Sequence, residues 1–362
     1  HVTPHPVIPA ADPAHAGSTP SLTTIPRESC MILAGDIGGT KTNLACFAPH
    51  GDRLTVVEER TVRSADYPGL DTIVQEFIAG RTVPLTGACF GIAGPVIQGR
   101  CEATNLPWVV ETAALQRILS LESVSLINDL EATAYGTQTL PEESFALLQA
   151  GSPQPRGNIA VIAAGTGLGE AALLWDNGRS RAIASEGGHA DFAPRTLLEL
   201  ELCQYLVKTF GHASYERVLS GPGKLNIYRF LKETGRWEEP AWLAEELTSG
   251  DPSAKISEYG LSGRSELCVQ ALDLFASIYG AEAGNLALKF LARGGVYVGG
   301  GIAPKLLKKL TDGAFMKAFR EKGRLASFLS AIPVRVVLEQ KTALYGAAHY
   351  GWSRVTHAHP PR

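Results

Sequence analysis

The sequence predicts an α/β protein with two domains. The chain has 362 residues, of which 45% are hydrophobic and 19% are charged, and a globular chain of this length usually forms about two domains. One segment beginning at Met31 and another beginning at Asn158 each contain an apolar run, a glycine-rich turn and a second apolar run. This repeated order indicates two units, each with a sheet that is covered by helices.

The first unit begins with three strands and continues with alternating helices and strands, which is typical of a mixed sheet. The segment YPGLDTIVQEFIAG has helical apolar spacing and ends at Gly80. The expected strands are 31–37, 42–47, 55–64, 86–96 and the first part of 123–136, and the expected helices are 67–80, 110–120 and the second part of 123–136.

The second unit follows a connection at 141–157 that we expect to be a loop. Its strand, glycine turn and strand occupy 158–175, and we expect the chain after them to be largely helical. The stretch GGVYVGGGIAPKLLKKL then returns to a strand, three glycines and a helix whose first turn holds Pro304. The expected helices are 197–210, 224–233, 240–250, 267–292 and 340–352.

The predicted organisation has four parts. Residues 1–30 are rich in Pro, Ser, Thr and His, lack the apolar core of a signal peptide and are predicted to be a disordered tail. A small α/β domain is expected over 31–138 and a large α/β domain over 139–339, with a C-terminal helix at 340–353 that packs back on the small domain.

Composition excludes several classes of protein. The formal net charge is −3, which does not favour a binder of nucleic acid or of anionic membranes, and no apolar run is long enough to cross a bilayer. The six cysteines form no C-x-x-C pair, so we expect free thiols in a reducing, cytoplasmic compartment.

Three glycine clusters offer backbone amides to an anion, because glycine lets the main chain approach without a side chain between. They are GDIGGT from Gly35, GTGLG from Gly165 and GGG from Gly299. A hairpin turn is the simpler interpretation of any one of them. None matches the Walker phosphate loop or the dinucleotide-binding fingerprint, so neither a Walker NTPase nor a Rossmann dehydrogenase is favoured.

With these clusters in this order, the chain from Met31 to Gly351 resembles the bacterial-type glucokinases of the actin/hexokinase/Hsp70 superfamily. The resemblance implies an actin-like, hexokinase-type ATPase fold of two domains with a cleft between them. It implies that the first two clusters hold the nucleotide phosphates, that the third lies against the adenosine, and that Asp36 binds Mg²⁺, most simply through water. The implied nucleotide-binding residues are Gly35, Asp36, Ile37, Gly38, Gly39, Thr40, Gly165, Thr166, Gly167, Gly299, Gly300 and Gly301.

Asn128 and Asp129 stand where an expected strand meets an expected helix. Phosphoryl transfer to an alcohol needs a carboxylate that orients the hydroxyl and accepts its proton. The resemblance makes Asp129 this base and Asn128 a ligand of a sugar hydroxyl. The alternative is that the two residues only cap the helix that follows.

The segment ASEGGHADFAP carries Glu186 and His189, whose side chains together offer the acceptors and donors that sugar hydroxyls need. The E-G-G-H spacing matches the family's sugar-binding motif, and Glu216 matches a further sugar-binding glutamate. Asn105 lies in a loop that the resemblance brings near the sugar, whereas Trp108 is expected to pack in the core. The alternatives are a structural histidine and a solvated helical glutamate.

The predicted function is therefore ATP-dependent phosphorylation of glucose to glucose 6-phosphate, the first step of glycolysis. Only Cys203 follows the E-G-G-H motif closely, so the cysteine-rich zinc site of the related ROK group is not expected. A homodimer is possible by resemblance alone. The rival hypotheses are a kinase for another hexose, a sugar-sensing regulator and an actin-like polymer, and the donor, ATP, ADP or polyphosphate, stays open.

Overall fold

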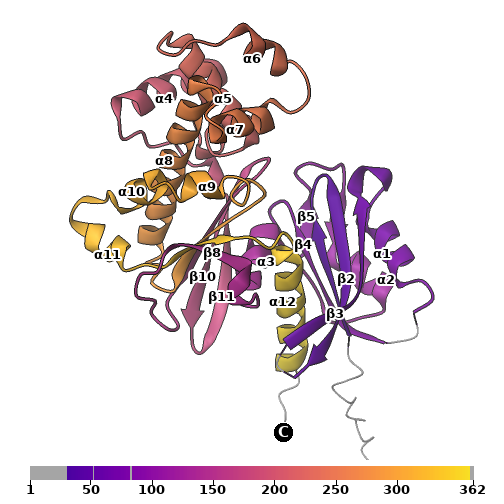
Figure 1. Cartoon of the computed structure of the whole chain (residues 1–362). Coiled ribbons are helices and arrows are strands. Elements are labelled where there is room, and N and C mark those ends of the chain that lie inside the picture. Colours follow the sequence, from indigo (N-terminus) through magenta and orange to yellow (C-terminus); the bar gives the residue numbers. More distant parts are fainter. Residues whose placement is uncertain (1–30, 52, 82–83, 359–362) are drawn as a thin grey trace, which may run out of the picture.

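The structure is a computed structural model that describes residues 31–51, 53–81 and 84–358. Its elements gather around two sheets, one formed by the chain before residue 129 and the other by the chain from residue 145 (Figure 1). The tail predicted at residues 1–30 lies outside the described residues, and the predicted limits of the two domains stay a prediction.

The first sheet has the strand order β3-β2-β1-β4-β7, in which β1 pairs antiparallel with β2 and parallel with β4. Helices α1 and α2 bury apolar side chains in the core of this half. Trp108 is 3% exposed and belongs to that core, as expected. The elements are β1 (Met31–Ile37), β2 (Lys41–His50), β3 (Arg53–Arg63), α1 (Leu70–Ile78), β4 (Leu85–Ile92), β5 (Arg100–Glu102), β6 (Val109–Glu111), α2 (Thr112–Leu119) and β7 (Val124–Asn128).

The second sheet repeats this pairing. Its order is β11-β10-β9-β12-β13-β8, and β9 pairs antiparallel with β10 and parallel with β12, as β1 does with β2 and β4. The two strand–turn–strand units of the sequence are therefore equivalent places in two similar sheets. The strands are β8 (Phe145–Gln149), β9 (Ile159–Ala164), β10 (Leu168–Asp176), β11 (Arg179–Ser185), β12 (Gly295–Gly299) and β13 (Val334–Val337).

Two strands contradict the prediction for this half. The segment expected to be a loop contains β8, and the segment expected to be helical contains β11. Both lie at edges of the sheet, where a strand is short or carries polar residues on its exposed face. Neither therefore shows the long apolar run that marked the central strands.

Helices cover the second sheet, and α8 is buried along most of its length. One predicted boundary was wrong, because the chain after β12 makes turns until α9 begins at Leu307, so Pro304 lies before the helix. Gly300 has a φ of +80°, which favours a turn over a helix at this point. The helices are α4 (Leu197–Phe210), α5 (Gly221–Glu233), α6 (Ala241–Glu246), α7 (Pro252–Leu261), α8 (Glu266–Lys289), α9 (Leu307–Leu310), α10 (Ala314–Arg320) and α11 (Ala326–Ser330).

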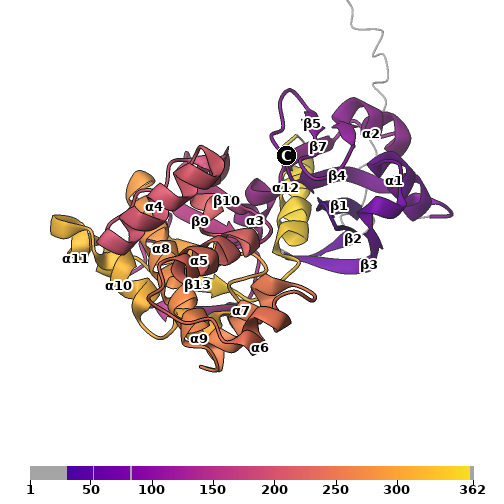
Figure 2. The ribbon, with the colours of Figure 1, turned by 90° about the horizontal axis from the view of Figure 1, so that it is seen from above.

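Helices α3 (Asp129–Gly136) and α12 (Thr342–Ala358) stand side by side between the two sheets (Figures 1 and 2). Helix α12 packs on β1 and β4 of the first sheet, and α3 also contacts β9, β10 and β11 of the second. A side-chain carbon on Gly346 would overlap the carbonyl oxygen of Ala132, and one on Gly136 would overlap that of Thr342. The two helices therefore approach closely at the place where the halves of the molecule meet.

No helix within the described ranges is long and apolar enough to span a membrane. The cysteines at 46, 89, 101, 203 and 268 are all free thiols.

Candidate active site

A cleft of about 580 Å³ lies between the two sheets and is lined by residues from both. All three glycine clusters reach it, together with the start of α3 and the E-G-G-H segment. The residues that the sequence predicted and the cleft contains are Asp36, Gly38, Gly39, Asn105, Asn128, Asp129, Gly165, Thr166, Gly167, Glu186, His189, Glu216, Gly299, Gly300 and Gly301.

Three predicted nucleotide residues are not among those that line the cleft. Gly35 is buried in β1, where a side chain would overlap the Phe90 ring, and Ile37 is buried in the core. Thr40 is exposed, and its carbonyl oxygen accepts a hydrogen bond from Ser64 N at 3.1 Å. Gly35 and Ile37 therefore belong to the core beneath the turn. Contact between the Thr40 hydroxyl and phosphate stays a prediction.

Two glycines of these turns are close-packed against neighbouring residues. A side-chain carbon on Gly39 would lie 2.6 Å from Cβ of Asn105, which places this turn directly on the predicted sugar loop. A side-chain carbon on Gly300 would overlap the carbonyl oxygen of Ala164, so the third cluster lies on the end of β9. Only glycine fits these two positions without moving the backbone.

Asn128 caps α3 and also lines the cleft, and its role as a sugar ligand stays a prediction. Its Oδ1 accepts a hydrogen bond from Leu130 N at 2.8 Å, and its backbone N–H donates to Glu131 Oε2 at 3.0 Å, so it caps α3. Its Nδ2 donates to the carbonyl oxygen of Gly94 at 3.1 Å. Although it is only 6% exposed, it lines the cleft, so the cap and the cleft use the same side chain.

Asp129 is the first residue of α3 and lies half-buried on the cleft wall. Burial and the nearby carboxylates of Asp36 and Glu186 together raise its pKa to about 7, although hydrogen bonds from backbone N–H groups oppose them. A carboxyl group with a pKa near neutrality can exchange a proton with a bound hydroxyl at physiological pH.

Asp36 faces the same cleft from β1. Burial raises its pKa, and a hydrogen bond from Asn43 Nδ2 to Asp36 Oδ2 at 3.2 Å lowers it in part. Thr61 Oγ1 donates to Asn43 Oδ1 at 2.8 Å and so orients the Asn43 amide toward Asp36. A single carboxylate on a turn that leads into the cleft fits a magnesium ion that keeps most of its water, since Mg²⁺ prefers oxygen ligands and dehydrates reluctantly.

Glu186, His189 and Glu216 come together on the opposite side of the cleft. His189 Nδ1 lies 4.0 Å from Glu216 Oε1, and the two side chains are 61% and 32% exposed. Glu216 Oε2 accepts a hydrogen bond from Leu168 N at 3.0 Å, and it lies so close to Gly167 that a side chain there would overlap it. The predicted sugar glutamate thus touches the second glycine turn.

Sequence reasoning missed several polar residues of the cleft. Lys305 lies four residues after Gly301 of the third glycine cluster, and this position in the sequence is a signal that could have identified it. Thr133 lies four residues after Asp129 in the expected helix, and residues four apart share one face of a helix, so it too was detectable from the sequence. The other missed residues gave no such signal, because only the tertiary structure brings them to the cleft. The full set of polar cleft residues that the sequence analysis missed is Thr104, Thr133, Ser185, Lys305, Glu339, Gln340 and Thr342.

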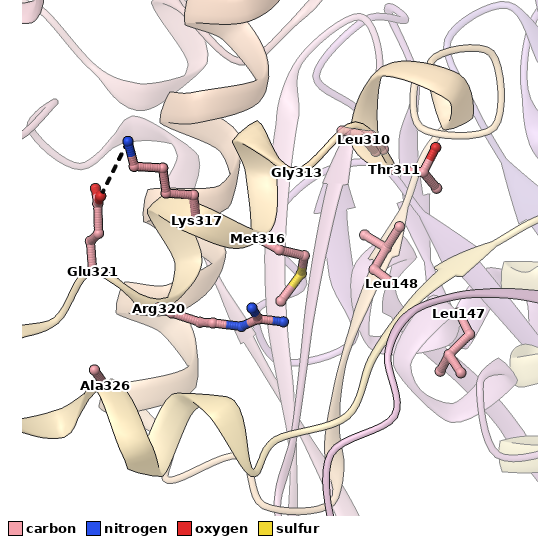
Figure 3. A pocket seen from close by; sticks show the side chains of 10 residues that line it. All are labelled: Leu147, Leu148, Leu310, Thr311, Gly313, Met316, Lys317, Arg320, Glu321 and Ala326. Atoms are coloured by element: carbon pink, nitrogen blue, oxygen red, sulfur yellow. Dashed lines mark ion pairs between the residues drawn. The ribbon is translucent and has the colours of Figure 1, made fainter.

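A second cavity of about 680 Å³ lies far from the glycine turns, between β8 and helices α9, α10 and α11 (Figure 3). It contains none of the predicted site residues. Arg320 extends across it, with Nε hydrogen-bonded to Gln149 Oε1 at 2.6 Å, and Leu148 and Met316 form its apolar wall. The cleft between the sheets is therefore the candidate active site.

The family model named Glucokinase matches residues 33–353. The chain belongs to the glucokinase family. A glucokinase of Synechocystis sp. is 44% identical over 342 residues, covering 88% of this chain and 96% of the relative. A glucokinase of Nostoc sp. is 42% identical over 336 residues, covering 88% of this chain and 98% of the relative.

A solved structure agrees with this family assignment. The crystal structure of a glucokinase from an Antarctic psychrotroph is 30% identical and superimposes with a TM-score of 0.80, covering 89% of this chain and 99% of that chain. The predicted two-domain, actin-like fold of the hexokinase type is thereby confirmed.

Proposed function

We propose that this protein transfers the γ-phosphoryl group of ATP to the 6-hydroxyl of glucose, as an ATP- and magnesium-dependent glucokinase of the cytoplasm whose product enters glycolysis. The observation that carries the proposal is the position of Asp129. It lines the same cleft as the glycine turns and Glu186, and the charges of Asp36 and Glu186 both act on it. A carboxyl group there can accept the proton of an alcohol that is held next to a phosphate.

The reaction follows from these positions. Asp129 accepts the proton of the 6-hydroxyl as the sugar oxygen bonds to the γ-phosphorus, and the bond to the bridging oxygen of ATP breaks to release ADP. The N–H groups of Gly38 and Gly165 close their turns by donating to the carbonyl oxygens of Lys41 and Gly167. The other backbone amides of these two turns stabilise the charge on the transferred phosphoryl group. A magnesium ion held by Asp36 through water would neutralise charge on the phosphates.

The sugar is held by residues that recognise hydroxyl groups. Asn105, Asn128, Glu186, His189 and Glu216 supply amide, carboxylate and imidazole groups around one space, and such a set discriminates among sugars through unpaired polar groups. We infer that the two domains, 31–138 with helix 340–353 and 139–339, close on the sugar and exclude water.

The first test is turnover in a coupled assay with Mg-ATP and a panel of glucose, mannose, fructose and N-acetylglucosamine. We expect the highest kcat/KM with glucose. A higher value with another hexose would keep the reaction and change the substrate. No turnover by folded protein that binds ATP would favour a different donor or a sugar-sensing regulator. Light scattering of the same sample measures whether the protein forms the homodimer that the resemblance suggests.

The second test is Asp129→Asn. The amide cannot accept the proton, so kcat should fall by about 10²-fold to 10⁴-fold, the usual contribution of a general base. Glucose affinity, measured by calorimetry, should stay within a few-fold of the wild-type value. Loss of both glucose binding and turnover would instead indicate that Asp129 has a structural role.

A further inference from the structure

Glu170 is a buried carboxyl group directly behind the sugar-binding segment, and the proposed reaction does not use it. It lies in β10, just after the second glycine turn, and is 1% exposed. Its Oε1 is buried and has no hydrogen-bond partner among the residues that the structure describes. A buried acidic side chain without a partner is costly unless it carries a proton or has a function.

The side chain of Glu170 presses against the main chain of the E-G-G-H motif. A side-chain carbon on Gly187 would overlap Oε2 of Glu170. A second connection runs through Ser185, whose Oγ donates to the carbonyl oxygen of Glu170 at 3.2 Å and accepts from Gly187 N at 3.1 Å. The neighbouring Gly188 lies equally close to the carbonyl oxygen of Leu168. The close contacts at Gly187 and Gly188 therefore hold the main chain that carries Glu186 and His189 against β10.

Helix α8 carries charged and polar residues that act on the Glu170 carboxyl group. Glu282 is fully buried there and accepts hydrogen bonds from Asn285 Nδ2 at 2.7 Å and Lys289 Nζ at 3.1 Å. Tyr279 of the same helix donates its hydroxyl to backbone oxygens of β9 and β12. The other titratable groups around this region are Tyr215, Lys322, Glu186, His189 and, across the cleft, Asp129.

These surroundings favour the neutral form of the carboxyl group. Burial and the nearby Glu282 together raise the pKa of Glu170 to about 7, although Lys289 opposes both. Hydrogen bonds from Asn285 and Lys289 compensate the buried charge of Glu282. No such hydrogen bond reaches Glu170 Oε1 among the described residues.

We propose that Glu170 is a positioning residue for sugar binding: its neutral carboxyl group supports the backbone at Gly187, and ionisation of that group displaces the segment 185–190 and weakens the sugar site. The proposal rests on the proposed function only for the identity of the sugar. An ionised carboxylate in this place has no donor and must recruit water or move, and the backbone it touches carries Glu186 and His189. Sugar affinity is thereby coupled to pH through a residue that does not touch the sugar.

The first test measures the segment without any ligand. Hydrogen exchange of the peptide covering 185–190, corrected for the intrinsic effect of pH, should show less protection at pH 8.5 than at pH 6 in the wild-type protein. Glu170→Gln, which is neutral at both pH values and has the same shape, should show no such loss. Equal losses in both proteins would overturn the proposal whatever sugar the protein uses, so this result is distinct from a failure of the proposed function.

The second test measures glucose binding by calorimetry at the same two pH values. We expect the ratio of Kd at pH 8.5 to Kd at pH 6 to be roughly fivefold larger in the wild-type protein than in Glu170→Gln, the lower end of common coupling between linked sites. Both proteins keep His189 and Asp129, so the difference reports Glu170. The matched control is Glu199→Gln, another buried carboxyl group of this half, which bonds to Arg195; it should keep the wild-type ratio.

The third test uses the contact itself. Gly187→Ala should weaken glucose binding because the new methyl group overlaps the Glu170 carboxyl. Adding Glu170→Ala makes room for that methyl group and should restore part of the affinity. If the double variant binds glucose no better than Gly187→Ala, the contact between the two residues does not position the segment, and the proposal is wrong.

Discussion

Asp129 shows at the scale of one residue how burial prepares a carboxyl group for proton transfer. It lies at the first position of α3, where the helix dipole and backbone N–H groups favour the ionised form. Burial and two neighbouring carboxylates outweigh these effects and bring its pKa to about 7. The group is thus poised to accept a proton at neutral pH, although it begins a helix.

The pH dependence of kcat/KM for glucose should report this carboxyl group. A base must be deprotonated to act, so activity should rise with pH up to about 7, with a tenfold change for each pH unit well below that value. Steady-state rates between pH 5 and 6 at saturating Mg-ATP provide the measurement, in a range below the pKa of about 7 of Glu170, which therefore keeps most of its proton. A flat profile over this range would contradict the assignment of Asp129 as the base.

At the scale of the element, α3 depends on the residue that also lines the cleft. Asn128 caps the helix with Oδ1 and Glu131 completes a capping box, so the strand-to-helix junction that holds Asp129 is fixed by local hydrogen bonds. Stability and sugar binding are therefore both sensitive to position 128, and a pair of variants can separate them.

Asn128→Ser keeps a capping oxygen and removes the amide, whereas Asn128→Ala removes both. We expect the alanine variant to lose about 1 kcal/mol more free energy of unfolding than the serine variant, the usual value of a cap. Both variants should bind glucose more weakly to a similar extent, because both lack the amide. Urea denaturation and calorimetry measure the two quantities. If the serine variant bound glucose as tightly as the wild-type protein, Asn128 would be a cap only.

At the scale of the whole molecule, α3 and α12 join the two sheets. Helix α12 comes from the end of the chain yet packs on the first sheet, and α3 contacts strands of the second (Figures 1 and 2). Their close approach at Gly136 and Gly346 leaves no room for a side chain on either helix. Glu339, Gln340 and Thr342 reach the cleft from the start of α12, so the joint and the site share residues.

Gly346→Ala should therefore destabilise the protein by about 1 to 3 kcal/mol through overpacking, although alanine is the better helix former. It should also lower kcat/KM, because separation of the two helices changes how the domains face each other. The control on the same helix is Gly351→Ala, whose new methyl group would lie 3.1 Å from Cys89 Cβ and 3.2 Å from a side-chain carbon of Ile32, without the overlap with backbone that Gly346→Ala produces. Equal stability of the two variants in urea would show that the α3–α12 contact is not tightly packed.

Much of the site could be predicted from local patterns. Each glycine cluster follows an apolar strand in the sequence. A strand–turn–strand order places the amides of the turn at the ends of the two strands, independently of the rest of the fold. The pair Asn128 and Asp129 and the E-G-G-H motif were likewise legible, because each is a short run with its own chemistry. These are local features, determined by periodicity and by backbone freedom at glycine.

Only the tertiary structure decided which of these groups meet. Strand β8 was missed because it pairs with β13, which lies far away in the sequence. Strand β11 follows β10 directly through the turn at Asn177 and Gly178 and was missed because polar residues interrupt its apolar ones. Thr342 likewise reaches the cleft only through long-range packing, and Glu170 looks like an ordinary strand residue until Gly187 and Glu282 pack near it in the folded chain. The sequence by itself determined the turns and the chemistry of the side chains, whereas burial and neighbouring charge, which exist only in the folded chain, decided their pKa values and their partners.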